Sequence, residues 1–186
     1  MGTMTTLTAE DGHRLSAYRA APSGTPKGGL VVVQEIFGVN HHIQGMCDRF
    51  AADGYVALAP AIFDRVEPGI NLGYTADDIE QGRSIRGKVD IADMVRDVRA
   101  AVGYYGGGIA ETASETPRCP VLLHFGETDQ GIPAEHWARI RAAHPEVPLH
   151  TYPAGHGFSC DERASFHKPS AELARQRTLG FFQALL

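Results

Sequence analysis

The sequence predicts an α/β fold with a mostly parallel central sheet and helices on both faces. Two observations support this prediction. Short apolar runs that suit buried strands alternate along the chain with segments of helical periodicity. The chain also has 186 residues and is 43% hydrophobic, which is enough to form one domain with a substantial core. We therefore expect a single domain over residues 1–186.

The first elements are a hairpin and a buried strand. Residues 5–18 alternate around Asp11-Gly12, a dipeptide typical of hairpin turns, with Leu7 and Leu15 expected to point inward. Residues 30–33 read Leu-Val-Val-Val, a continuous apolar run that is typical of a strand buried on both faces.

The later elements continue the alternation of helices and strands. We expect an irregular loop over 62–75 and a long helix over 76–102, with Gly82 and Gly87 as candidate break points. The remaining expected elements are helices over 43–53, 134–143 and 169–186, strands over 55–59, 121–125 and 149–152, and a glycine turn over 103–108.

Composition excludes several classes of partner. The net charge is -5 and the basic residues are scattered, so the chain lacks the basic surface expected of a nucleic-acid-binding protein. No apolar stretch approaches the ~20 residues that span a membrane. The three cysteines are odd in number and widely spaced, which argues against a disulfide framework and for the cytoplasm. We expect a small-molecule partner.

Three polar residues follow predicted strands: Glu35, Asp129 and His156. Ligands of parallel sheets bind at the carboxyl ends of the strands, so these residues are candidates for one site. Glycines flank His156, whose imidazole could act as a base, and a carboxylate such as Asp129 could orient it. The alternatives are a turn histidine, an aspartate that forms a local turn, and a Glu35 that pairs with an arginine.

A metal site is the weaker hypothesis. His41, His42 and His156 could supply ligands, but adjacent histidines usually point apart, and the chain contains no His-x-x-x-His pair. We expect no metal.

Residues 103–108 imitate the glycine spacing of a nucleophile elbow, with Tyr105 at the position of the nucleophile. A phenol with a pKa near 10 is a poor nucleophile for ester chemistry, so we expect a plain strand-to-loop turn there. Neither Gly-x-Ser-x-Gly nor Gly-x-Cys-x-Gly occurs anywhere in the chain.

An ordered set of short motifs resembles the dienelactone hydrolase family of α/β-hydrolases. The resemblance implies a three-layer α/β-hydrolase-like fold and hydrolysis of a lactone or small carboxylic ester, as in carboxymethylenebutenolidase, without a metal or organic cofactor. The motifs are Gln-Glu-Ile-Phe-Gly-Val-Asn at 34–40, Gly-Tyr-Val-Ala-Leu-Ala-Pro at 54–60, Gly-Tyr-Tyr-Gly at 103–106, His-Phe-Gly-x-x-Asp at 124–129 and Gly-His-Gly-Phe at 155–158.

The resemblance also implies roles for individual residues. Asp129 and His156 would be the acid and base of a Cys-His-Asp triad, and Glu35 would interact with the nucleophilic cysteine in the resting enzyme. The residues implied in substrate binding are Ile36, Phe37, Phe158 and Arg163.

One departure from the family is large. The family's strand, Gly-x-Cys-x-Gly elbow and following helix, roughly 30 residues or more, have no counterpart between Val102 and Gly103. None of Cys47, Cys119 and Cys160 occupies the position of the nucleophile.

Loss of this unit would leave many backbone groups unpaired, at about 1–3 kcal/mol each, against a typical stability of about 5–15 kcal/mol. We therefore expect that the native protein contains this unit and its cysteine. The alternatives are a sheet repaired by rearrangement or partner exchange, and a non-catalytic small-molecule-binding member of the fold. The protein would be a monomer or homodimer.

Overall fold

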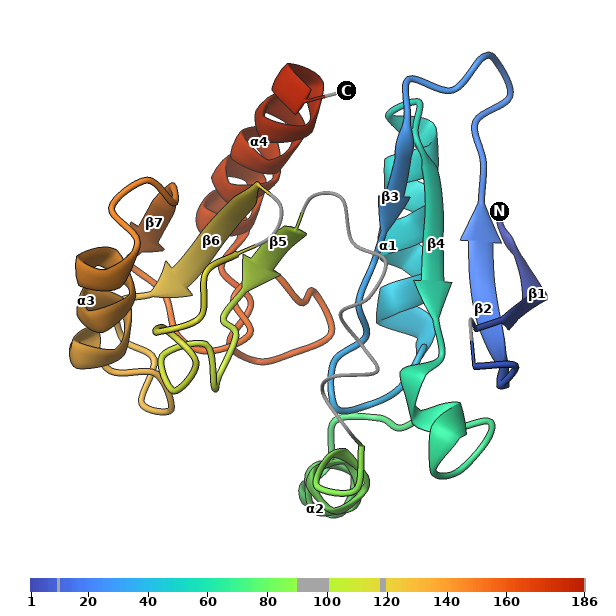
Figure 1. Cartoon of the computed structure of the whole chain (residues 1–186), viewed down its shortest axis with the longest axis horizontal. Coiled ribbons are helices and arrows are strands. Elements are labelled where there is room, and N and C mark those ends of the chain that lie inside the picture. The colour runs from blue at the N-terminus through green and yellow to red at the C-terminus, as the bar shows by residue number, and fades with distance from the viewer. Residues whose placement is uncertain (10, 90–100, 118–119, 186) are drawn as a thin grey trace. The chain divides into compact units, whose positions relative to one another are not determined.

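The computed structural model describes residues 1–9, 11–89, 101–117 and 120–185. The chain divides into two compact units, which are described separately: Met1–Asp97, the first unit, and Val98–Leu186, the second unit (Figure 1). Within the described residues, no helix has both the length and the apolar character needed to cross a membrane.

The first unit is built on a four-stranded sheet in the order β1-β2-β4-β3. Strands β1 (Thr3–Thr8) and β2 (Arg14–Ala20) form the predicted antiparallel hairpin, in which Leu7 lies opposite Leu15 and both side chains are half-buried. Strand β4 (Val56–Pro60) pairs antiparallel with β2 and parallel with β3 (Gly29–Val31).

Helix α1 (His41–Ala52) packs on this sheet through buried Ile43, Cys47 and Phe50 (Figure 1). It begins at Asn40, whose side chain accepts a hydrogen bond from the Ile43 amide at 3.3 Å, as expected of an N-cap. The short 3-10 helix η1 (Ile62–Arg65) and helix α2 (Ala76–Arg86) complete the unit.

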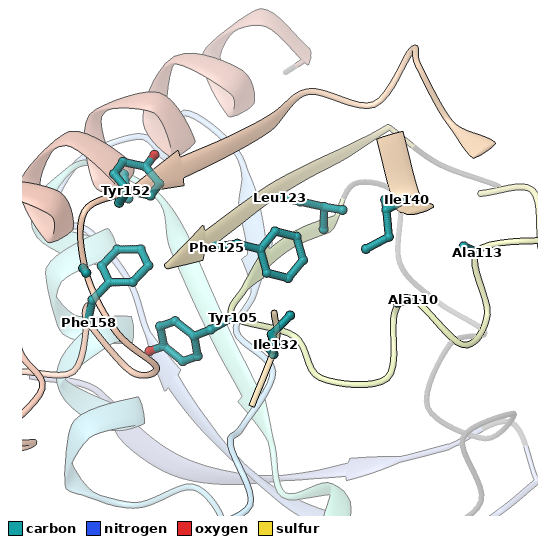
Figure 2. Packing of buried hydrophobic residues seen from close by; sticks show 11 residues of the cluster. Tyr105, Ala110, Ala113, Leu123, Phe125, Ile132, Ile140, Tyr152 and Phe158 are labelled. Carbon is teal, nitrogen blue, oxygen red and sulfur yellow. The ribbon is translucent and has the colours of Figure 1, made fainter. Parts of the chain in front are cut away.

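The second unit is built on three parallel strands in the order β5-β6-β7. The strands are β5 (Ala101–Tyr104), β6 (Val121–Gly126) and β7 (Leu149–Tyr152), and the helices are α3 (Ala134–Ala143) and α4 (Lys168–Leu185). Leu123 and Phe125 on β6 share a core cluster with Ile140 of α3 (Figure 2).

The opposite face of β6 carries His124, which is fully buried and connects the sheet to α4. Its Nδ1 lies 2.8 Å from the hydroxyl of Tyr152 on β7, and its Nε2 lies 3.1 Å from the hydroxyl of Thr178 on α4. Burial lowers the pKa of His124 to about 3, so its ring is neutral in the folded protein at neutral pH.

Two predictions about elements are wrong. Strand 30–33 is not buried on both faces, because Leu30 is buried whereas Val31 and Val33 are 47% and 51% exposed. The long helix predicted over 76–102 ends at Arg86, and residues 101–102 belong to β5. The part of that helix predicted over 90–100 lies outside the described residues.

Candidate active site

Two of the predicted site residues come together in the second unit, just beyond the carboxyl ends of neighbouring strands. Asp129 follows β6, and His156 follows β7. Backbone hydrogen bonds join the two loops: the Glu127 amide donates to the Tyr152 carbonyl at 2.8 Å, and the Thr128 amide donates to the Ala154 carbonyl at 3.1 Å.

Gly126 allows this close approach. A Cβ atom at Gly126 would collide with the carbonyl oxygen of Ala154 and would lie 2.8 Å from that of Gly155. The last residue of β6 therefore needs to be glycine for the histidine loop to pass over the end of the strand.

The carboxylate of Asp129 binds on both sides. Its Oδ2 lies 2.8 Å from Nδ1 of His156, while its Oδ1 accepts hydrogen bonds from the amides of Gly131 at 2.8 Å and Ile132 at 3.1 Å. Both roles that the sequence left open for this aspartate, the local turn and the histidine partner, are therefore present in one side chain.

The two partners differ in exposure. The side chain of Asp129 is 0% exposed, whereas that of His156 is 44% exposed. An ionised Asp129 can only accept, so Nδ1 of His156 must carry the proton in this pair. The neutral ring then leaves Nε2 as an acceptor, which is the arrangement that a general base needs.

Phe158 and Arg163 lie on the segment that follows His156. Phe158 is fully buried and packs against Tyr105 and Tyr152 (Figure 2). This burial assigns its ring to the core of the unit rather than to a surface that a substrate could touch.

Arg163 is half-buried and packs on Gly157, where a Cβ atom would lie 2.7 Å from its Nη1. Gly157 has a φ of +76°, which glycine tolerates and other residues rarely adopt. Among the described residues, no acidic side chain forms an ion pair with Arg163.

Glu35, Ile36 and Phe37 belong to the first unit, so the structure does not place them with Asp129 and His156. Ile36 is half-buried and Phe37 is 2% exposed, with its ring edge-on to that of Tyr74 at 4.6 Å. The Glu35 Oε2 atom is buried and lacks a hydrogen-bond partner among the described residues. The arginine pair considered from the sequence is therefore not formed there.

The two cysteines that the structure describes are buried. Cys47 lies in α1, where burial and the nearby Asp48 raise the pKa of its thiol to about 12. Cys160 has no exposed surface, and Cys119 lies outside the described residues. His41 and His42 belong to α1 in the first unit. Within either unit taken alone, the described residues assemble no group of three metal-ligating side chains.

Tyr105 was predicted only as part of a plain turn, and its contact with His156 was not predicted from the sequence. Its ring centroid lies 5.2 Å from that of His156, and its φ is +38°. The glycine-rich segment around it indicated an unusual backbone, but the contact depends on how three strand ends are aligned.

Comparisons with known proteins agree on one family. The model of the dienelactone hydrolase family matches residues 15–90 and 86–186. A protein of Azospirillum brasilense, provisionally named carboxymethylenebutenolidase, is 34% identical over 224 residues, covering 95% of this chain and 96% of the relative. The carboxymethylenebutenolidase of Pseudomonas putida is 29% identical over 94% of this chain and 93% of its own.

A solved structure shows the same fold. The crystal structure of a provisional dienelactone hydrolase from Klebsiella pneumoniae superimposes with a TM-score of 0.79 at 25% identity, covering 98% of both chains.

Proposed function

The chain belongs to the dienelactone hydrolase family, and from this premise we propose that Asp129 and His156 are the acid and base of its active site. Membership makes the protein a carboxylic ester or lactone hydrolase. The observation that carries the assignment of the two residues is the 2.8 Å contact between a fully buried carboxylate and a half-exposed imidazole at adjoining strand ends.

The proposed reaction uses a cysteine thiol as nucleophile. Nε2 of His156 takes the thiol proton, and the sulfur attacks the carbonyl carbon of the ester. The imidazolium, stabilised by Asp129, then returns the proton to the departing alkoxide, which leaves a thioester. Water activated by His156 hydrolyses the thioester, releases the carboxylic acid and restores the thiol.

We propose that this cysteine lies on a strand–elbow–helix unit that belongs ahead of β5. An insertion between Val102 and Gly103, the position expected from the sequence, would divide that strand. Two features of the comparisons support an interruption in the middle of the chain. The family model matches in two pieces that meet at residues 86–90. The alignment to the Azospirillum relative also spans 224 positions, more than the 186 residues of this chain, so it must open gaps in this chain.

The sheets supply a physical argument for the same unit. Among the described strands, β3 ends one sheet and β5 ends the other, and each is parallel to its single neighbour. Exposed Val31 ends β3 and exposed Val33 follows two residues later. Apolar β-branched side chains at a strand edge are typical of an edge that pairs with another strand.

The state of Glu35 supports its proposed role beside the thiol. A buried carboxylate oxygen without a donor is costly, by about 1–3 kcal/mol, unless a partner arrives. A cysteine S–H on the proposed unit could donate to Oε2 in the resting enzyme.

We assign Arg163 to the substrate. Arg163 is half-buried and has no acidic partner in the part of the chain that the structure describes. Such a guanidinium is a good site for a carboxylate, which it can bind with two parallel hydrogen bonds. The substrate proposed here is therefore a lactone or small ester that also carries a carboxylate. Ile36, which is half-buried, would contact its apolar part, and buried Phe37 and Phe158 would support the walls.

The cellular compartment and the oligomeric state of the protein are also proposals. The thiol of Cys47 is free, which fits a reducing cytoplasm. A monomer or homodimer would suffice because Asp129 and His156 come from one chain.

Grafting tests the catalytic proposal. The residues of the Azospirillum relative that lie opposite the gap are inserted directly before Ala101, which leaves β5 intact, and hydrolysis of a p-nitrophenyl ester is measured. We expect activity to appear and to fall by roughly a thousandfold or more in the grafted His156→Ala variant. A matched graft with its cysteine replaced by alanine is the control.

The alternative is a non-catalytic protein that binds small acids. The absence of any Gly-x-Cys-x-Gly sequence favours it. A folded graft without activity, together with saturable binding of a small carboxylic acid by the ungrafted chain, would replace the hydrolase proposal with this one.

A further inference from the structure

Tyr105 has an unusual backbone conformation immediately after β5. Its φ is +38°, and it is the sole non-glycine residue with positive φ within the ranges that the structure describes. Its amide donates to the carbonyl of His124 at 2.7 Å, which holds this conformation in place. Because Cβ clashes in the left-handed region cost about 1–2 kcal/mol, a glycine would be more stable here. The contacts of the buried tyrosine ring must therefore offset this cost.

The ring of Tyr105 lies against the catalytic candidate. It is 9% exposed, and its centroid lies 5.2 Å from that of His156 with an angle of 57° between the ring planes. It also meets the ring of Phe158 edge-on at 5.6 Å. Figure 2 shows these two rings side by side. Phe158 is fully buried, so it gives Tyr105 a rigid support.

Residues that follow three adjoining strands therefore carry or contact one imidazole, that of His156. The loop after β7 carries His156, and the loop after β6 supplies the carboxylate that binds Nδ1. The residue after β5 supplies the ring contact. One hydrogen bond fixes the position of Nδ1 but leaves the ring free to rock about that bond, whereas a second contact on the ring restricts this motion.

We propose that Tyr105 is a positioning residue that holds the imidazole of His156 in the orientation in which Nδ1 meets Asp129 and Nε2 faces the reacting thiol. This inference rests on the proposed function for its catalytic purpose, but the contact itself does not depend on the presence of a nucleophile. The strained backbone of Tyr105 directs the ring toward His156, whereas a relaxed turn would direct it elsewhere.

NMR of the ungrafted chain tests the inference separately from the hydrolase proposal. The Nδ1 proton of His156 and the relaxation of its Cε1–H group report ring order. In Tyr105→Phe, which keeps the ring, we expect both signals to match the unchanged chain. In Tyr105→Leu and Tyr105→Gly, we expect Nδ1 proton exchange at least tenfold faster and a more mobile ring.

The glycine variant separates positioning from stability. It removes the ring and also relieves the strain of the positive φ, which glycine tolerates. We expect Tyr105→Gly to unfold at no lower temperature than Tyr105→Leu, yet to lose the order of His156 to the same extent. Tyr104→Phe is the neighbouring control: it removes the hydroxyl that lies 2.7 Å from that of Thr178 and should leave the His156 signals unchanged. Unchanged His156 order in Tyr105→Gly, or equal loss in Tyr105→Phe, would overturn the inference.

Discussion

Nδ1 of His156 lies 2.8 Å from Oδ2 of Asp129, and the other oxygen of that carboxylate accepts two backbone amides. The aspartate is thus fixed by its own loop before it binds the histidine. This arrangement selects the Nδ1–H form of the neutral ring and presents Nε2 as a base.

Replacing Asp129 separates its two roles. Asp129→Asn keeps an oxygen for the amides of Gly131 and Ile132, so we expect little loss of stability, but the Nδ1–H form of His156 should no longer dominate. Asp129→Ala removes the oxygen as well and should cost about 1–3 kcal/mol. Nitrogen-15 NMR of the imidazole and urea unfolding provide the two readouts. An unchanged tautomer in Asp129→Asn would contradict the assignment.

Gly126→Ala should separate the two loops of the site. The added Cβ would collide with the Ala154 carbonyl and disturb the two backbone hydrogen bonds between the loops. We expect a loss of about 2 kcal/mol or more and a disordered His156. Gly180→Ala in α4 is the matched control, since a Cβ there meets nothing within 4 Å. It should stabilise the helix by about 0.5–1 kcal/mol.

Acid should destabilise the second unit through His124. The unfolded chain takes up a proton there near pH 6.5, but the folded chain does so only near pH 3. Between these values the unfolded state binds more protons, so the free energy of unfolding decreases as the pH is lowered, by up to about 1.4 kcal/mol per pH unit. Above pH 6.5 this contribution is constant.

Urea unfolding between pH 4 and pH 7 measures this effect. Other groups titrate over the same range, so the informative quantity is the difference between the unchanged chain and His124→Gln. The variant should be less stable at pH 7 but lose less stability on acidification. Parallel pH profiles would show that His124 does not carry the effect.

Cys47 should not react in the folded protein. Its burial and its raised pKa leave almost no thiolate at pH 7.5. We expect iodoacetamide to leave it unlabelled until the chain is unfolded in urea, as measured by mass spectrometry of its peptide. Rapid labelling of Cys47 in the native state would make it a rival nucleophile.

Much of this structure could be predicted from sequence because the signals were local. Helix 134–143 and strand 149–152 have the predicted bounds, since each combines a clear apolar pattern with a Pro or Gly boundary nearby. Asp129 and His156 were predicted from their positions just after such strands. These predictions require only the order of elements along the chain.

The predictions that failed depend on contacts between elements distant in sequence. Leu-Val-Val-Val at 30–33 reads as a doubly buried strand, but whether Val31 is covered depends on what pairs with or packs on β3. Apolar residues at 101–102 suit a helix or a strand, and pairing with β6 decides in favour of the strand. The contact of Tyr105 with His156 likewise follows from the alignment of β5 with β7 across β6.

The intact mass of the protein isolated from cells that express it from its own gene is the most direct measurement. The 186 residues correspond to 20.1 kDa. We predict a mass larger by at least about 3 kDa, the size of a strand–elbow–helix unit that carries the nucleophile. A mass of 20.1 kDa would contradict this prediction, and the protein would then be a binding member of its family.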